Sequence, residues 1–253
     1  MSKTHLVFSC AHAHWEFSNE RADWLSRLII DVRPDVVVNL GDNLDLPSLY
    51  QASQGKKPVG QSYKKDIDSH IDFQQRLWEP IKNRKKRLPY RVCLHGNHEQ
   101  RIKNTLSYQP ELDGTVSFDD LRLSDWYDEI VPYEGNTPGT IEIDGITYAH
   151  YIISGVSGRP LSSEHQAHSL LSKTFQSVTV GHTHTFDYCV RTRPNGTKIM
   201  GAVVGCYSDY TNDWAGEIGK LWDRGVLIKR NVDKGEYDHE WISLKTIKNE
   251  YEY

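Results

Sequence analysis

Five short apolar runs in this chain each end directly in a polar cluster, and this alternation constrains the fold more than any other feature. The runs cover residues 6–9, 36–38, 91–94, 146–149 and 177–180. Runs such as 36–38, apolar on both faces, are typical of strands in parallel sheets, which are covered on both sides. Ligands of open α/β sheets bind beyond the carboxyl ends of such strands. We therefore expect an α/β fold with a functional site at one sheet edge.

The segments between the runs suggest two halves with different organisation. Helical apolar spacing predicts helices over residues 19–30 and 61–86, so the first half reads strand–helix–strand–helix–strand. Residues 102–138 are expected to be an irregular excursion over the surface. In the second half, a hairpin is predicted around Asp144-Gly145, followed by a short helix, a strand and further hairpins. The expected elements are 140–149, 164–174, 177–180, 188–204 and 225–244, and this half is expected to be antiparallel.

Composition sets limits on class and compartment. The chain has 253 residues, 38% of them hydrophobic and 25% charged, which are ordinary globular values. No repeat or linker divides it, so we expect one domain over residues 1–253. The net charge of −4 shows no basic excess of the kind that marks many nucleic-acid binders. Four dispersed cysteines, no run of about 18 apolar residues and no signal-peptide core predict a cytoplasmic protein without a membrane span, in the host cytoplasm if it is viral.

The five polar clusters together predict a two-metal site. They are Cys10-x-His12, Gly41-Asp42-x-x-Asp45, Gly96-Asn97-His98-Glu99, His150 and Gly181-His182-x-His184. Each is a weak signal alone, but five at successive strand ends are not expected by chance. Imidazole and carboxylate groups bind divalent cations, and two cations can clamp a phosphoryl group during displacement. We expect Asp42 to bridge them. His182 and His184, two apart in an extended segment, would place one imidazole on each.

The ordered set resembles the calcineurin-like metallophosphoesterases, whose pattern is DxH, GDxxD, GNH(D/E), a single His and GHxH. Four of the five motifs match, and the resemblance spans about residues 4–210. It implies an αββα fold, a two-layer β-sheet sandwich flanked by helices, with mixed parallel and antiparallel strands. The sequence around Gly96-Asn97-His98-Glu99 and Arg101 is also similar to small phosphoesterases found in phage genomes.

The resemblance also implies a role for each matching residue. Metal one would be held by His12, Asp42 and His184, and metal two by Asp42, Asn97, His150 and His182. His98 would sit beside the scissile phosphate as general acid or as electrostatic partner of the leaving oxygen, with Asp45 orienting it. A metal-bound hydroxide would attack phosphorus. Independently of the resemblance, Arg101 lies close to His98 in the sequence, and we expect Arg101 and Asn97 to contact substrate.

The first motif departs from the family pattern, because Cys10 stands where an aspartate is expected. Three interpretations remain open. Cys10 is a thiolate ligand of metal one, which would favour zinc or iron over manganese or magnesium. Alternatively, Cys10 is a small buried hydrophobic residue and metal one binds weakly. In the third, His14 supplies the missing ligand, although an exposed loop histidine is the simpler expectation for His14. The expected cofactors are two divalent ions, with manganese, zinc and iron as the candidates.

Two functions follow from these motifs. The favoured one is a metal-dependent phosphodiesterase, because no inserted cap domain is present to enclose a small monoester. DNA, RNA or nucleotides are the leading substrates. The alternative is a nucleic-acid-binding protein on a phosphoesterase scaffold whose first metal site is impaired at Cys10. Retention of His98, Asp45 and Asn97 favours the enzyme.

Two further features are left open by the sequence. The basic run 82–87 is explained either as a solvated helix end, where cations complement the helix dipole, or as a track for phosphate groups. Tyr207 and Tyr210 are either core residues or platforms for stacking a base.

Overall fold

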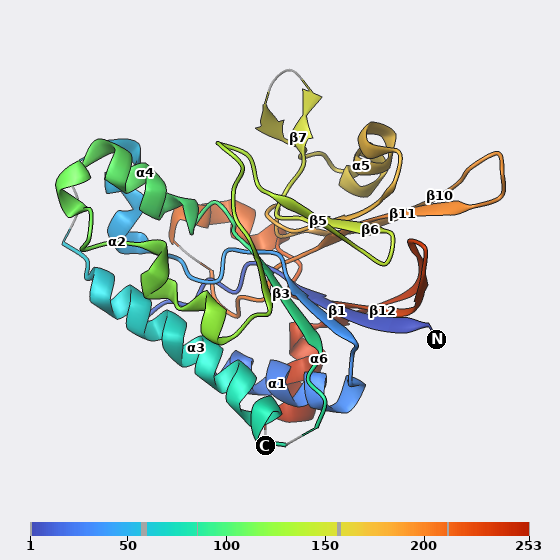
Figure 1. The fold of residues 1–253 in the computed structure, drawn as a ribbon, viewed down its shortest axis with the longest axis horizontal. Helices are drawn as coiled ribbons and strands as arrows, with labels where there is room; N and C mark the ends of the chain where they lie inside the picture. Colours follow the sequence, from blue (N-terminus) through green and yellow to red (C-terminus); the bar gives the residue numbers. More distant parts are fainter. Residues whose placement is uncertain (1, 57–59, 85, 156–157, 212, 253) are drawn as a thin grey trace.

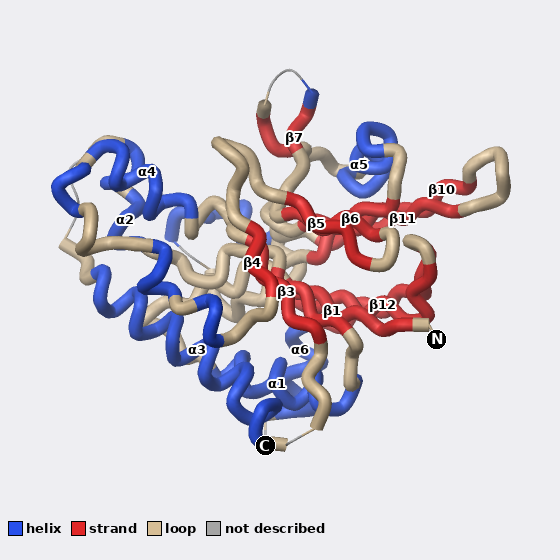
Figure 2. The backbone as a smooth tube through the Cα atoms, viewed as in Figure 1, coloured by secondary structure: helices blue, strands red, loops and turns tan. Residues whose placement is uncertain are grey.

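The computed structural model describes residues 2–56, 60–84, 86–155, 158–211 and 213–252. Two β-sheets pack face to face, with helices on their outer surfaces (Figures 1 and 2). The first sheet has the order β13-β12-β1-β2-β3-β4 and the second β10-β11-β9-β6-β5. This is the mixed αββα sandwich expected from the sequence.

The first sheet is built around four parallel strands. Its strands are β1 (Lys3–Phe8), β2 (Val36–Asn39), β3 (Tyr90–Leu94), β4 (Glu129–Val131), β12 (Gly225–Asp233) and β13 (Glu236–Ser243). β1 to β4 run parallel, whereas β12 pairs antiparallel with β1 and with β13. The helices against this sheet are α1 (Glu20–Val32), α3 (Tyr63–Asn83) and α6 (Leu244–Tyr251), all on the same side of it in Figure 1.

Alternate side chains of the first sheet enter different cores. Leu6 and Phe8 of β1 pack in the cluster that contains the helices, whereas Val7 packs in the cluster shared with the second sheet. Because successive side chains of a strand point to opposite faces, a strand between two cores has to be apolar at every position. This is why the apolar runs show no alternation.

The second sheet places two parallel strands beside the first. Its strands are β5 (Thr140–Ile143), β6 (Ile146–Ala149), β9 (Ser177–Val180), β10 (Phe186–Thr192) and β11 (Lys198–Val204). Helix α5 (Gln166–Thr174) contributes Ala167, Leu170 and Leu171 to the core on the outer face of this sheet. A separate hairpin joins β7 (Ile153–Ser154) to β8 (Arg159–Pro160).

Two sequence expectations need correction. The segment 102–138 is not irregular: α4 (Gln100–Tyr108) follows the third polar cluster directly, and β4 extends the first sheet as a short edge strand. Short 3-10 helices at 110–112, 118–121 and 123–125 connect them; α2 (Pro47–Tyr50) and a 3-10 turn at 52–54 lie earlier in the chain.

The second half is also not purely antiparallel, because β9 pairs parallel with both β6 and β11. Helix α5 lies between β6 and β9 in the sequence, and such a crossover connection allows neighbouring strands to run in the same direction. The last hairpin, β12–β13, belongs to the first sheet rather than to the second, a point on which the sequence made no prediction. The remaining expected strands and helices are confirmed, with shifts of a few residues at their ends.

The parallel strands bring their carboxyl ends to one side of the sandwich. At this edge the loop after β2 touches the loop after β3: a Cβ atom on Gly41 would lie 2.5 Å from the backbone nitrogen of Gly96. Gly41 also has a φ of 101°, which other residues rarely adopt. Only glycine therefore allows these two loops to approach so closely. Among the described helices, none is long and apolar enough to cross a bilayer.

Candidate metal centre

Side chains from four strand ends form two ligand groups that share Asp42. The potential ligand atoms within each group all lie within 4.8 Å of one another. The first group is Cys10, His12, Asp42 and His184, and the second is Asp42, His150 and His182. A single carboxylate common to both groups is the arrangement expected for two bridged cations.

The first group is enclosed by protein. Its two histidines face each other, with 3.2 Å between His12 Nε2 and His184 Nε2. Cys10 Sγ lies 4.0 Å from Asp42 Oδ2 and 3.0 Å from Ser9 Oγ. His12 and Cys10 are fully buried. Nitrogen, carboxylate and sulfur donors converge here without solvent, which fits a borderline divalent cation such as zinc or iron.

The second group is oriented by the backbone. His150 Nδ1 lies 2.8 Å from the carbonyl oxygen of Leu40, which makes Nδ1 the protonated nitrogen. The other ring nitrogen, Nε2, then points at Asp42 Oδ2 at 3.3 Å and at Asn97 Oδ1 at 3.0 Å. Metal-binding histidines characteristically donate their second nitrogen in this way. His182 lies beside it, with 5.1 Å between the ring centres.

Unusual backbone conformations are concentrated at this site. Of twelve described non-glycine residues with positive φ, five are potential ligands. They are Cys10 (52°), His12 (47°), Asp42 (54°), His182 (69°) and His184 (62°). Such conformations cost free energy and persist where the surrounding structure holds them, typically at functional sites. Here they turn each chain sharply at its strand end.

Burial and mutual contacts set the charges of these groups. Burial alone would raise the pKa of Asp42, but the neighbouring His150 and His98 outweigh it and hold that pKa well below its usual value. Burial, together with His150, lowers the pKa of His182 to about 3. Burial, reinforced by Asp42, raises the pKa of the Cys10 thiol. The pKa of His150, by contrast, is raised by the neighbouring Asp42 carboxylate, which outweighs burial. Metal ligands have to be deprotonated, so the ionised Asp42 carboxylate and the neutral His182 ring suit a cation, whereas His150 and Cys10 would release protons on binding one.

A third group places His98 at the mouth of the centre. His98 Nδ1 lies 2.8 Å from the carbonyl oxygen of Asp45 and 3.2 Å from its carboxylate. Asp45 also lies 3.6 Å from His12 Nδ1, so it contacts both histidines. On the other side of the ring, His98 Nε2 lies 3.2 Å from the guanidinium of Arg101. His98 is therefore held between a carboxylate and a cation.

A cavity of about 320 Å³ opens onto the centre and is lined by Asp42, Asn97, His98, Arg101, His182 and His184. Tyr50 and Trp222 also line it, together with Thr183 and Ile218. The Arg101 guanidinium lies 4.9 Å from the Tyr50 ring centre, and the Trp222 ring lies edge-on to His184 at 4.3 Å. Aromatic surfaces thus belong to the parts of the wall beside Arg101 and beside His184.

All residues proposed from the motifs as ligands or catalytic groups converge here, namely Cys10, His12, Asp42, Asp45, Asn97, His98, Arg101, His150, His182 and His184. One geometric premise was wrong: the segment carrying His182 and His184 is not extended, and the two left-handed residues direct their rings to different groups.

The expectation for His14 fails, whereas the core interpretation of Tyr207 and Tyr210 is confirmed. His14 is not exposed but is 6% accessible, stacked on Trp15, and it joins none of the ligand groups found among the described residues. Tyr207 is fully buried and Tyr210 is 8% accessible, so neither presents a face to a base.

Sequence reasoning missed a carboxylate that ties the loops together. Glu99 is fully buried and accepts hydrogen bonds from the backbone N–H groups of Asp42, Asn43 and Gly96, at 3.0, 2.7 and 2.7 Å. It also accepts one from the Asn43 side chain at 3.0 Å. The position of Glu99 directly after His98 in the motif was the sequence signal that could have identified it. Tyr50 and Trp222 carried no such signal.

Comparison with known proteins gives a family match. The model of the calcineurin-like phosphoesterase family matches residues 4–188. No curated protein matches the chain. Similar solved structures include an archaeal phosphodiesterase, with 12% identity, coverage of 94% of this chain and 99% of that one, and a TM-score of 0.43. A Pseudomonas putida nuclease MPE has 14% identity, 93% and 87% coverage and a TM-score of 0.39. The E. coli phosphoesterase YfcE is 12% identical, with coverage of 95% of this chain and 99% of that one and a TM-score of 0.40.

Proposed function

The chain belongs to the calcineurin-like phosphoesterase family, a family of metal-dependent phosphoesterases, and on that premise we propose that it hydrolyses phosphodiesters, with nucleic acids or nucleotides as the leading class. The sharing of Asp42 by two ligand groups carries this proposal. It is the feature that one catalytic centre with two cations requires and that a merely structural histidine cluster does not.

The donor atoms fit two divalent cations. One would be held by Cys10, His12, Asp42 and His184, and the other by Asp42, Asn97, His150 and His182. When bound, such cations supply Lewis acidity toward phosphoryl oxygens and make water a stronger nucleophile at neutral pH. In this assignment Cys10 is a ligand, because its sulfur lies within the first group and His14 does not.

His98 and Arg101 are proposed to act on the substrate directly. His98 is close enough to the shared carboxylate group for its backbone N–H to donate to Asp42 Oδ1 at 2.9 Å. Its Nε2 nitrogen, beside Arg101, is the atom proposed to deliver a proton to the leaving oxygen. Asp45 holds the ring through Nδ1, and Arg101 provides positive charge for a phosphate oxygen. Asn97 lines the same cavity and would contact substrate as well as metal.

The cavity wall supports a diester rather than a monoester. A diester carries a group on each side of the phosphorus, and each group needs a surface. Tyr50 stands beside Arg101, and Trp222 beside His184, so aromatic surfaces accompany both the proposed acid and the metal ligands. Aromatic faces stack on nucleobases of any sequence, which favours nucleotides or single-stranded nucleic acid.

The proposal treats residues 1–253 as one domain. The family match ends at residue 188, but the hairpin β12–β13 beyond it pairs with β1 in the first sheet. β11, also beyond the match, pairs with β9. The C-terminal strands thus complete both sheets.

Metal content and hydrolysis test the proposal together. Elemental analysis of the purified chain should find up to two bound divalent ions. Hydrolysis of bis(p-nitrophenyl) phosphate should disappear on chelation and return on adding manganese, zinc or iron, with magnesium and calcium as comparisons. Turnover of p-nitrophenyl phosphate should be slower than that of the diester. Faster monoester turnover would contradict the diester assignment while leaving the phosphoesterase intact.

One outcome would favour the second candidate function, a nucleic-acid-binding protein, over the enzyme. If the chain is inert with every metal yet binds single-stranded DNA with an affinity that falls steeply as salt rises, phosphate contacts are its function. Cys10 at the aspartate position is the observation that keeps this second candidate. Clear turnover by the wild-type chain that is lost in His98→Ala would exclude it.

A further inference from the structure

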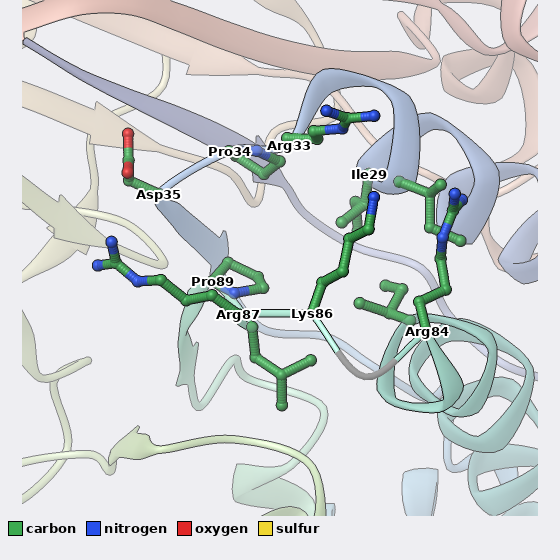
Figure 3. A pocket seen from close by; sticks show the side chains of 11 residues that line it. Ile29, Arg33, Pro34, Asp35, Arg84, Lys86, Arg87 and Pro89 are labelled. Carbon is green, nitrogen blue, oxygen red and sulfur yellow. The ribbon is translucent and has the colours of Figure 1, made fainter.

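A second cavity lies at the opposite edge of the first sheet. Its volume is about 380 Å³, and it is formed where α1 leads into β2 and α3 leads into β3 (Figure 3). Pro34 and Pro89 line it, one just before β2 and the other just before β3. The metal ligands follow the other ends of these strands. At about 3.3 Å per residue, strands of four and five residues separate the two edges by roughly 15 Å.

The floor of this cavity is aliphatic. Ile29 comes from α1 and Ile81 from α3, and both are buried. Pro34 and Pro89 are buried beside them, and Leu88 is half-buried. A ligand resting here would therefore cover apolar surface, which contributes favourably to binding in proportion to the area removed from water.

The rim carries four exposed cations. Arg33 follows α1, Arg84 follows α3, and Lys86 and Arg87 lie in the connection to β3. Figure 3 shows their long side chains around the aliphatic residues. None of the four forms an ion pair with a residue that the structure describes.

Some other arginines of this protein do form ion pairs with acidic side chains. Arg76 contacts Asp23 and Asp72, Arg91 contacts Asp128, and Arg230 contacts Glu240. The one acidic residue in the cavity lining is Asp35, and its carboxylate accepts a hydrogen bond at 2.9 Å from the backbone N–H of Thr4. Four like charges around a hollow repel one another, and an anion bound among them would relieve that repulsion.

A helix end explains only part of this arrangement. Cations after α1 and α3 do complement the dipoles of these helices. The dipoles do not account for an aliphatic hollow shared by the two helix ends. A track for a nucleic-acid backbone would need charges along an open surface, whereas a cavity of this volume has the size of a small-molecule site.

We propose that this cavity is a non-catalytic binding site for an organic phosphate, with the phosphate among the guanidinium groups and an apolar group of the ligand on the aliphatic floor. Arginine suits this task because its planar donors match phosphate oxygens in pairs. The site lies beyond the proposed function, since it shares no residue with the metal centre. Both a nucleotide and an alkyl phosphate have the required chemistry, and the test separates them.

Calorimetric titration of the full chain tests the site. The probes are hexyl phosphate, adenosine 5′-monophosphate, inorganic phosphate, hexanol and an oligothymidylate. The double variant Arg84→Glu/Arg87→Glu is compared with Lys173→Glu, a reversal of an exposed cation on α5. At least one of the two organic phosphates should bind about 10- to 100-fold more weakly to the double variant, because it loses charge-assisted contacts. Lys173→Glu should bind like the wild type. The organic phosphate whose affinity falls more in the double variant shows whether the site is built for a nucleotide or for an alkyl phosphate.

Three results would overturn the proposal. Equal affinity of the double variant and the wild type for both organic phosphates shows that any binding is elsewhere. Inorganic phosphate binding as tightly as hexyl phosphate and the nucleotide shows that the floor contributes nothing. Loss of binding only for an oligothymidylate shows a nucleic-acid track.

Two features of the experiment distinguish a loss of ligand binding from unfolding of the variant and from a loss of catalytic activity. Thermal unfolding of each variant checks its structure, and Arg84→Gln/Arg87→Gln replaces the reversal if that variant unfolds. Because binding is measured without turnover, failure here and failure of the proposed hydrolysis are distinguishable.

Discussion

The two edges of the first sheet use charge in opposite ways. At the carboxyl edge, buried groups are matched to one another: Asp42 lies against His150, and His98 against Asp45. At the amino edge, Arg84, Lys86 and Arg87 are exposed and form no ion pair with a described residue. A buried, matched cluster is held in place before any ligand arrives, whereas an exposed cluster gains its partners from the ligand. Substitutions at the two edges should therefore affect different measurements.

The largest effect is expected from removing the shared carboxylate. Asp42→Asn should lower diester hydrolysis by about 10⁴-fold or more, since both cations lose a charged ligand and each supplies several kcal/mol of transition-state stabilisation. Metal content by elemental analysis should fall in parallel. Asp68→Asn, which removes an exposed carboxylate paired with Lys64, should change neither. A variant that keeps two ions and full activity would show that Asp42 is not the bridge.

The next effect concerns the proposed acid. His98→Ala should cut turnover by about 10²- to 10⁴-fold, the usual contribution of a positioned proton donor, with metal content almost unchanged. The loss should be smaller when the leaving group is a nitrophenolate, which needs no proton. If metal and activity are lost together, His98 is a ligand instead.

Variants of Cys10 test whether its sulfur is a metal ligand at the carboxyl edge. Cys10→Ala should reduce occupancy of one metal site and lower activity by about 10- to 100-fold, the range for a weakened metal environment. Cys10→Asp should retain hydrolysis and shift the preferred ion toward manganese or magnesium. Unchanged metal content and preference in both variants would identify Cys10 as a core residue only.

A buried histidine that lies at neither edge of the first sheet should make the free energy of unfolding depend on pH. His70 of α3 is fully buried; Nε2 faces the Leu121 carbonyl at 3.1 Å, and Nδ1 has no hydrogen-bond partner among the described residues. Burial, partly offset by Glu99, lowers its pKa from 6.5 to about 4. The unfolded state therefore takes up a proton first, and stability is lost as pH falls from 6.5 toward 4.

The size of this effect follows from proton linkage. Between pH 7 and pH 4.5, the wild type should lose about 2 kcal/mol more unfolding free energy than His70→Gln, measured by urea titration. The exposed His165→Gln serves as the control and should follow the wild type. Parallel pH profiles for wild type and His70→Gln would mean that His70 titrates normally in the folded protein.

The smallest effect on hydrolysis is expected from substitutions at the amino edge. Arg84→Glu/Arg87→Glu should leave hydrolysis of bis(p-nitrophenyl) phosphate within about twofold of the wild type. Charges roughly 15 Å away, beyond the Debye length at physiological salt, are largely screened. A tenfold change would show that the amino edge is coupled to the metal centre.

The metal centre was predictable because its geometry is a consequence of local sequence. Parallel strands of one sheet end at the same edge, so Asp42 and Asn97, which follow β2 and β3, had to meet. His182 follows a strand of the second sheet, and its motif predicted its role but not its position. The hairpin around Asp144-Gly145 was equally local, since a two-residue turn with positive φ at both positions specifies its own pairing. The hairpin around Asn195-Gly196 has a longer loop, in which Gly196 has the positive φ.

Other features depended on contacts between distant segments. The parallel pairing of β6, β9 and β11 and the position of β12 beside β1 are decided by which apolar faces pack together. Left-handed conformations at Cys10 and His184 are imposed by neighbouring loops, not by residue type.

The amino-edge cavity shows the same division between sequence and tertiary structure. The sequence by itself determined the basic residues after α3 and the strand ends that carry the ligands. Only the tertiary structure placed Arg33 beside Arg84, about fifty positions later, over a floor made of Ile29 and Ile81. Local propensity and strand direction act within a segment, whereas a cavity exists only after α1 and α3 have packed side by side on the sheet.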